Sequence, residues 1–418
     1  MEKLRRIRSY FSFVSGNYVV LVATWASTSF VSVWSYPYLS LYVLRLGGSY
    51  MAVSVMGYLS WLIMSLVCVP GGYIADYYGR KKIMVLGTYL RGLVIFLVAI
   101  APDWTTLILA NSIRAAFTWH TVAEYAAIMD AMPEEDRATA WATFSTIVSV
   151  TTLPAPIIGG YLFDTYGVVA LRWAWVATGI ADLGAAAIYW KCLKESLIAP
   201  EKPPKGLGLT PLAKFRTLMV ESFRETMGVL KWMPKDLKTL LAVVVIASFG
   251  GSLTGAFWIV YALDAVGITA TEWGLIETVN TVLQFALSIP GGKLADKYGK
   301  MKLLYMDLLV GPPAILAFIL SRNFPQMFLA RILPSAASIL AGSVWQAIET
   351  DMMPKGKRGR LQAVLPFFFM PTSMVGSVLG GWLYGVQEAY PFYLNIAASV
   401  LFIPLFIKYV KEPKKPPE

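Results

Sequence analysis

A thirteen-residue polar motif occurs twice in this chain, and each copy lies between two long apolar segments. The first copy, PGGYIADYYGRKK, occupies residues 70–82, and the second, PGGKLADKYGKMK, occupies residues 290–302. Eight of the thirteen positions are identical. The offset of 220–221 residues continues downstream, where Asp130 and Asp351 each precede a Met-Pro pair by one residue. An offset that is kept over this distance indicates an internal duplication.

Apolar runs of roughly 20–27 residues, six in each half, are long enough to cross a bilayer. They cover residues 18–44, 51–74, 82–101, 104–129, 138–163, 172–191, 238–263, 272–294, 301–320, 325–350, 361–385 and 391–409. With 57% hydrophobic and 15% charged residues, a chain of 418 residues is too apolar for a soluble protein. We therefore expect an all-α integral membrane protein with twelve transmembrane helices.

The formal net charge of +11 would also fit a nucleic-acid-binding protein, but the positions of the basic residues favour a membrane topology. If every run crosses and the N-terminus is cytoplasmic, thirty of the 36 Lys and Arg residues lie on cytoplasmic segments. Only Arg45, Arg172 and Arg322 lie outside. This asymmetry predicts a multi-pass protein of the cell membrane, with both termini in the cytoplasm, a lipid environment and no nucleic-acid partner.

The runs divide the chain into two halves, residues 1–190 and 238–418, joined by residues 191–237. From Thr210 onward the connection has the pattern of a basic amphipathic helix, which we expect to lie on the inner leaflet. The alternative is a regulatory partner site. The two cysteines suggest neither a disulfide nor a metal site, and no phosphate-binding loop or nucleophile elbow occurs in the sequence. We expect no enzyme, cofactor or metal.

The repeated form G-x-x-x-D-x-x-G-[RK] resembles the signature loop between helices 2 and 3 of the major facilitator superfamily. It consists of Gly72, Asp76, Gly79 and Arg80 in the first half and of Gly292, Asp296, Gly299 and Lys300 in the second. Tyr77 and Lys297 replace the Arg that usually follows the Asp. The resemblance covers residues 17–410. It implies two pseudo-symmetric six-helix bundles that rock about a central cavity.

The same resemblance implies a cytoplasmic gate, in which the two motif copies act together with Asp130 and Asp351. Asp76 is expected at the N-terminal end of span 11, where the helix dipole favours an acid. Arg80 is expected to approach Asp130 when the inside is closed.

Span 4 carries the polar group that points most directly to chemistry. Arg114, Thr121 and Glu124 fall on one face of a helix, and His120 lies one turn before Glu124. An Arg early in span 4 resembles the superfamily's R-x-x-x-G motif, which is tied to proton coupling, although Thr118 occupies the glycine position. A carboxylate beside a histidine can exchange a proton near neutral pH. The alternatives are a structural salt bridge for Glu124 and a core position for His120.

Three further spans carry polar or aromatic residues that predict a substrate cavity. These are Trp258 in span 7, Glu277, Asn280 and Gln284 in span 8, and Arg331 and Trp345 in span 10. Polar stripes in apolar spans face a water-filled cavity or another helix rather than lipid. Separately, Arg91 in span 3 and Asp182 in span 6 are predicted to form a structural pair.

The end of span 5, Pro154 to Gly160, resembles the G-P-x-x-G-G motif of superfamily exporters, with Ala155 at the first glycine. We therefore expect a monomeric secondary transporter that moves a small molecule by alternating access, with proton-coupled efflux as the first hypothesis. Proton-coupled uptake of a sugar or organic anion is the alternative within transport. A membrane sensor or lipid-handling protein that moves no solute is the alternative from another class.

Overall fold

The computed structural model describes residues 14–133, 136–197, 220, 224, 228, 233–353 and 358–411. In the first half, the described residues form six helical segments. They are α2 (Gly16–Ser35) continued by η1 (Tyr36–Tyr38) and α3 (Leu39–Arg45); α4 (Tyr50–Tyr78); α5 (Arg80–Ala99); α6 (Trp104–Ala116) continued by η2 (Phe117–His120) and α7 (Thr121–Asp130); α8 (Arg137–Thr152) continued by α9 (Ala155–Tyr166); and α10 (Val168–Cys192).

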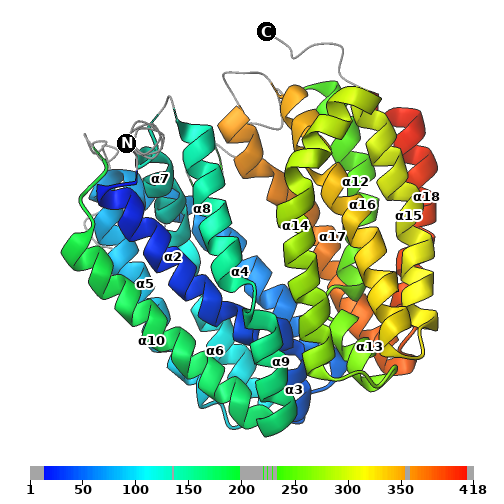
Figure 1. Ribbon diagram of the computed structural model, residues 1–418, viewed down its shortest axis with the longest axis horizontal. Coiled ribbons are helices and arrows are strands. Elements are labelled where there is room, and N and C mark those ends of the chain that lie inside the picture. The colour runs from blue at the N-terminus through cyan, green and yellow to red at the C-terminus, as the bar shows by residue number, and fades with distance from the viewer. Residues whose placement is uncertain are drawn as a thin grey trace, which may run out of the picture.

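The second half repeats this arrangement, and six segments are again described. They are α12 (Lys235–Thr254) continued by α13 (Trp258–Asp264); α14 (Ala270–Tyr298); α15 (Lys300–Leu320); α16 (Phe324–Asp351); α17 (Arg358–Val386); and α18 (Tyr390–Tyr409). Each half forms one helical bundle (Figure 1). The expected all-α fold of two six-helix bundles is confirmed. The helix predicted from Thr210 onward lies outside the described residues, apart from residues 220, 224 and 228.

Within the described residues, nine of these segments are long and apolar enough to cross a membrane by length and composition alone. The segments outside that set are residues 104–130, 270–298 and 358–386. The first two carry Arg114, Glu124 and Glu277, whose charges lower the local hydropathy. Charged groups in spans are costly, so these helices need polar partners inside the protein.

The turn between the two helices of each motif copy consists of a single glycine. Gly79 (φ 91°, ψ 140°) separates α4 from α5, and Gly299 (φ 94°, ψ 137°) separates α14 from α15. Other residues rarely adopt this backbone conformation. The two motif copies, residues 70–82 and 290–302, are therefore helical on both sides of this glycine, because one glycine suffices to reverse the chain.

The two ends of the molecule differ in how the bundles meet. We call the end that holds Gly79, Asp130 and Gly299 the motif end, and the end that holds Gly47, Gly167 and Gly267 the distal end. The bundles converge at the distal end, where α9 lies against α14 and α3 against α13 (Figure 1).

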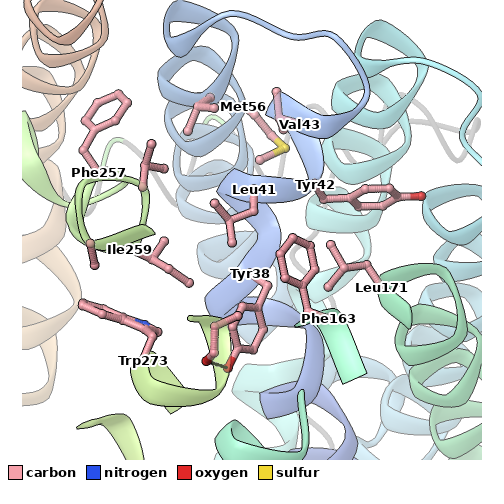
Figure 2. Packing of buried hydrophobic residues seen from close by; sticks show 14 of the residues in the cluster. Tyr38, Leu41, Tyr42, Val43, Met56, Phe163, Leu171, Phe257, Ile259 and Trp273 are labelled. Carbon is pink, nitrogen blue, oxygen red and sulfur yellow. Dashed lines mark hydrogen bonds between the residues drawn. The ribbon is translucent and has the colours of Figure 1, made fainter. Parts of the chain in front are cut away.

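A hydrophobic core shared by both bundles occupies the distal end. Figure 2 shows Tyr38 and Leu41 of the first bundle facing Ile259 and Trp273 of the second. At the motif end, by contrast, the described side chains form two separate cores, one in each bundle. Close packing of side chains thus joins the bundles at one end only.

The distal contact brings helix backbones unusually close together. A Cβ atom on Gly160 would lie 2.2 Å from the carbonyl oxygen of Ala270, and one on Gly274 would lie 2.4 Å from that of Pro156. Glycine at both positions therefore permits α9 and α14 to touch directly. Tyr38 stabilises the contact between α9 and α14. Its hydroxyl donates to the carbonyl oxygen of Pro156 at 2.7 Å and lies 3.3 Å from the carbonyl oxygen of Ala270.

The single-glycine turns generate a stability prediction. Alanine at Gly299 would add backbone strain of roughly 1–3 kcal/mol without a clash, because no described atom lies within 4 Å of its Cβ position. Alanine at Gly79 would add a contact of 2.6 Å to Glu195 Oε2. We expect both variants to lower the thermal midpoint of the detergent-purified protein, Gly79→Ala more than Gly299→Ala. Gly184→Ala is the control, because this helical position is open and should gain stability.

Candidate functional site

A cavity of about 250 Å³ lies inside the first bundle, between α2, α5, α7 and α10. Its wall includes several hydroxyl groups, those of Thr28, Ser29, Ser32, Thr88, Thr121 and Tyr189. Glu124 and Arg91 bring the only charges to this wall among the described residues. The cavity is therefore polar, although the bundle around it is apolar.

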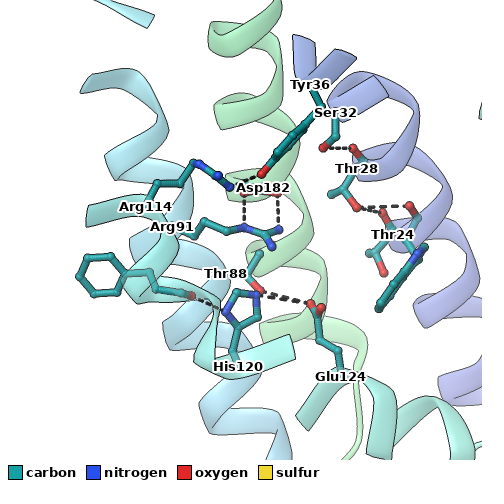
Figure 3. Close-up of polar contacts among 12 residues, drawn as sticks. Thr24, Thr28, Ser32, Tyr36, Thr88, Arg91, Arg114, His120, Glu124 and Asp182 are labelled. Atoms are coloured by element: carbon teal, nitrogen blue, oxygen red, sulfur yellow. Dashed lines mark hydrogen bonds and ion pairs between the residues drawn. The ribbon is translucent and has the colours of Figure 1, made fainter. Parts of the chain in front are cut away.

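Glu124, on α7, is only 6% exposed and faces two neighbouring helices through this cavity (Figure 3). The Thr88 hydroxyl on α5 donates to Oε1 of Glu124 at 3.5 Å. Tyr189 on α10 also interacts with the carboxylate, and its hydroxyl oxygen accepts a hydrogen bond of 3.0 Å from Thr24. The carboxylate is thus surrounded by hydroxyl groups that suit both its charged and its neutral form.

His120 is fully buried beside Glu124, as the spacing in span 4 predicts. Its Nε2 lies 3.8 Å from Oε1 of Glu124. Its Nδ1 lies 2.7 Å from the carbonyl oxygen of Phe117, so Nδ1 carries a proton and donates it to that carbonyl. In the neutral imidazole, Nε2 is then an acceptor, and it has no hydrogen-bond partner among the described residues. This acceptor lies beside a carboxylate that can carry a proton.

Arg91 and Asp182 form a two-pronged ion pair between α5 and α10, as predicted. Nε and Nη2 of Arg91 donate to the two carboxylate oxygens of Asp182 at 2.7 and 2.8 Å. The sequence predicts this pair as a structural contact, separate from the polar residues of span 4. In the structure, however, Arg91 also lines the cavity that contains Glu124. The sequence pattern could not reveal this proximity, because it depends on how α5 and α7 pack.

The structure does not bring Arg114 to Glu124. Arg114 donates to Asn111 at 2.9 Å and contacts the Tyr36 hydroxyl, and its guanidinium lies 5.0 Å from the Tyr36 ring centroid. The short 3₁₀ segment η2 separates Arg114 from Glu124. A 3₁₀ turn has fewer residues than an α-turn, so it rotates the two ends of span 4 relative to each other. The common face predicted from regular α-helical spacing is therefore lost.

In the second bundle, three predicted residues meet near the distal end. Nη2 of Arg331 lies 3.8 Å from Oε1 of Glu277, and its guanidinium lies 4.7 Å from the Trp258 ring centroid. Trp273, which the sequence analysis did not select, stacks on the same guanidinium at 5.6 Å. An Arg between two indole rings gains a cation–π interaction in addition to its ion pair.

The other predicted residues of this bundle lie apart from that group. Asn280 keeps a buried Oδ1 without a hydrogen-bond partner among the described residues, and Gln284 is exposed. Trp345 packs against Phe406, with ring centroids 5.3 Å apart, in the motif-end core of the second bundle.

The first motif copy forms a charge cluster at the motif end. Arg80 contacts the carboxylate of Asp130, and its other nitrogen lies 3.9 Å from Asp76. All three residues belong to the first bundle. The contact between Arg80 and Asp130 is present although the motif-end cores of the two bundles are separate, so it does not require the closed inside that the resemblance implies. The side chains of Asp296 and Asp351 and of the first turns of α17 lie outside the described residues, as does the surrounding of Gly292. Lys300 begins α15 directly after the Gly299 turn.

Two carboxylates that the sequence analysis did not select cap helices. Glu195 accepts the backbone N–H groups of Arg80 and Lys81 at 3.0 and 3.2 Å, which holds the start of α5. Asp164, on α9, accepts the N–H groups of Ala270 and Thr271 at 2.9 and 2.8 Å, which caps α14 across the bundle interface. A local capping residue can be read from sequence, but a capping partner 106 residues away cannot.

A duplicated, twelve-segment helical protein with polar groups inside its bundles has the architecture of a membrane transporter. The family model of the Major Facilitator Superfamily matches residues 17–239 and 239–418. The chain therefore belongs to this superfamily, and it is a transporter rather than an enzyme. The family resemblance of the repeated motif is confirmed.

Curated relatives are drug-resistance proteins. The chain is 25% identical over 382 residues to the multi-drug resistance efflux pump PmrA of Streptococcus pneumoniae, which covers 88% of this chain and 90% of PmrA. It is 26% identical over 158 residues to the quinolone resistance protein NorA of Staphylococcus aureus. That match spans 37% of this chain and 40% of NorA, about two fifths of the relative's length.

Solved structures share the fold. The inward-facing, occupied structure of a bacterial homologue of the lysosomal transporter Spinster has a TM-score of 0.67 at 15% identity and covers 96% of this chain and 95% of its own. A point mutant of the nucleoside transporter NupG has a TM-score of 0.68 at 13% identity, with 94% of this chain and 100% of the NupG chain covered.

The buried pair gives a prediction about structure and function together. Asp182→Ala leaves the partly buried Arg91 without its partner, and we expect a loss of roughly 3 kcal/mol of stability, the lower end of the range for buried pairs. The double variant Arg91→Met/Asp182→Leu removes both charges, and we expect it to recover most of the thermal midpoint. If the pair is only structural, the double variant also keeps transport. A folded double variant without transport would assign Arg91 to the Glu124 site.

Proposed function

We propose that this transporter exports small amphipathic molecules in exchange for protons, by alternating access of its two bundles. The observation that carries the proposal is Glu124, a carboxylate that is 6% exposed in a hydroxyl-lined cavity, with His120 Nε2 at 3.8 Å. The relationship to PmrA and NorA supports the direction of transport, because both carry names of drug resistance.

The charge of the cavity depends on one proton. Arg91 and Asp182 neutralise each other through two hydrogen bonds, so Glu124 alone sets the net charge. Deprotonation leaves one uncompensated negative charge in a region of low dielectric, whereas protonation removes it. Occupancy of this site can therefore bias which arrangement of the bundles is preferred.

The positive-inside asymmetry assigns the motif end to the cytoplasm. The bundles then share their core on the outer side, and their cytoplasmic cores are separate. We infer that the structure represents a conformation closed toward the outside. Rocking of the bundles would have to open the α9–α14 contact and bring the motif end together.

The alternative of organic-anion uptake needs an arginine that is free to bind the anion. Arg114 is held by Asn111 and Tyr36, and Arg331 by Glu277 and two indole rings. Both arginines therefore have partners inside their own bundle. This arrangement favours export of amphipathic compounds over recognition of an anion.

The coupling role of Glu124 is tested with Glu124→Gln in proteoliposomes. The amide cannot release a proton, so we expect export driven by an imposed pH gradient to fall at least about tenfold, the effect of roughly 1.4 kcal/mol. Exchange of labelled substrate across the membrane should persist in part, because the bundles can still rock with substrate bound. Ethidium and a fluoroquinolone serve as substrates.

Glu277→Gln is the control, since it removes a carboxylate that pairs with Arg331 near the distal end of the other bundle. Full driven transport by Glu124→Gln would refute the coupling role of Glu124. Loss of both driven transport and exchange would make Glu124 a structural or substrate-binding residue.

Alternating access is tested at Asp164, the residue that caps α14 at the distal end. Asp164 bonds the start of α14 only while the bundles touch at the distal end, and its removal should favour the arrangement in which that end is open. Loss of a cap changes a helix by about 0.5–2 kcal/mol, so Asp164→Ala should shift the ratio of conformations by roughly 2–30-fold.

The shift is measured by double electron–electron resonance between spin labels at two exposed distal positions, Val169 on α10 and Val386 on α17. Asp103→Ala is the control, because Asp103 caps α6 within the first bundle, with a bond of 2.9 Å to the N–H of Thr106. It should leave the ratio unchanged. Equal distance distributions for the Asp164→Ala and parental proteins would contradict the proposed role of this cap.

A further inference from the structure

A groove of about 630 Å³ lies outside the Glu124 site, on the surface of the first bundle at the motif end. It runs between the start of α5, the end of α10 and the residues that follow α10. Its lining combines two basic residues, Lys81 and Lys82, with apolar and aromatic side chains that include Leu86, Tyr89 and Trp190. The groove thus has the polarity of an amphipathic ligand.

The two lysines are available to an anion. Neither ammonium group has an ion-pair partner among the described residues, whereas the neighbouring Arg80 is held by Asp130 and Asp76. Glu195 also lines the groove, but its oxygens already accept N–H groups from Arg80, Lys81, Ser196 and Leu197 at 3.0–3.2 Å. Its charge is therefore directed at the backbone rather than at the open side of the groove.

The spacing along α5 matches the depth profile of a bilayer leaflet. At 1.5 Å per residue, Tyr89 lies about 10 Å deeper than Lys82. The polar layer of a leaflet is about 5–8 Å thick, so lysines at the headgroup level place Tyr89 among the acyl chains. Trp190 and Tyr89 are 67% and 47% exposed, which leaves their rings open to lipid. Tyrosine and tryptophan are enriched at this boundary.

We propose that this groove binds an anionic phospholipid of the leaflet at the motif end. The headgroup phosphate lies between Lys81 and Lys82, and an acyl chain lies along Leu86, Tyr89 and Trp190. The chain's own segment before α2 does not complement the lysines, because residues 1–13 contain four basic residues and one acidic residue. A negatively charged lipid supplies both the charge and the apolar length that the groove accepts.

The test uses the purified full-length protein in dodecylmaltoside micelles, with lipid binding measured by native mass spectrometry and by the shift of the thermal midpoint. Dioleoyl-phosphatidylglycerol should bind at least tenfold more tightly than dioleoyl-phosphatidylcholine. Lys81→Gln/Lys82→Gln should weaken phosphatidylglycerol binding by roughly 25-fold, about fivefold for each basic residue at a membrane surface. Binding of phosphatidylcholine should not change.

Lys235→Gln/Lys238→Gln is the matched control, because it removes the same charge from exposed positions at the motif end of the second bundle. It should change affinity less than twofold. Lys81→Arg/Lys82→Arg keeps both positive charges and should retain phosphatidylglycerol binding. This variant provides the test of charge if the glutamine variant does not fold. Equal binding of the two lipids, or equal effects of the two glutamine variants, would overturn the proposal. Displacement of phosphatidylglycerol by inorganic phosphate at the concentration of the lipid would also overturn it, because the groove would then bind a soluble anion.

Discussion

The direct contact between the backbones of α9 and α14 is the constraint on which the arrangement of the two bundles depends. Apolar surface is available all round a membrane helix, and lipid covers it as well as protein does, so hydrophobicity alone selects no neighbour. Close approach does select one, because dispersion and polar contacts act only at short range. Gly160 and Gly274 provide the room, and Tyr38 and Asp164 then add hydrogen bonds across the contact. The shared distal core forms around this point.

Inside the first bundle, the same environment determines how polar groups are arranged. Water is scarce in a span, so each charge must find its partner on a neighbouring helix. Arg91 and Asp182 satisfy each other, and Thr88 and Tyr189 surround Glu124. The result is one carboxylate whose proton is not fixed by a permanent counter-charge. The proposed exchange of a proton at Glu124 rests on this property, which the Arg91–Asp182 ion pair does not have.

The fold could be predicted from the sequence, because run length and a repeated motif are properties of single segments. The pair Arg91–Asp182 could also be predicted, since a charge inside a span needs an opposite one nearby. Glu277 and Arg331 were expected as residues of a substrate cavity, and the structure pairs them. The grouping of Arg114 with Glu124 was predicted wrongly, because the 3₁₀ segment η2 interrupts the regular α-helical spacing between them. The capping roles of Glu195 and Asp164 depend on tertiary contacts, for which no local pattern exists. The predicted roles of Asp296 and Asp351 stay predictions.

The two motif turns share their backbone angles but not their surroundings. Glu195 accepts hydrogen bonds from the N–H groups that follow Gly79, whereas no described atom lies within 4 Å of the Cβ position of Gly299. The first turn is thus held by a carboxylate from the residues that follow the last helix of the same bundle, which fixes where α5 begins relative to α10. A chimaera made from two copies of the first half would carry this contact twice, so that both bundles would fix their motif turns in the same way.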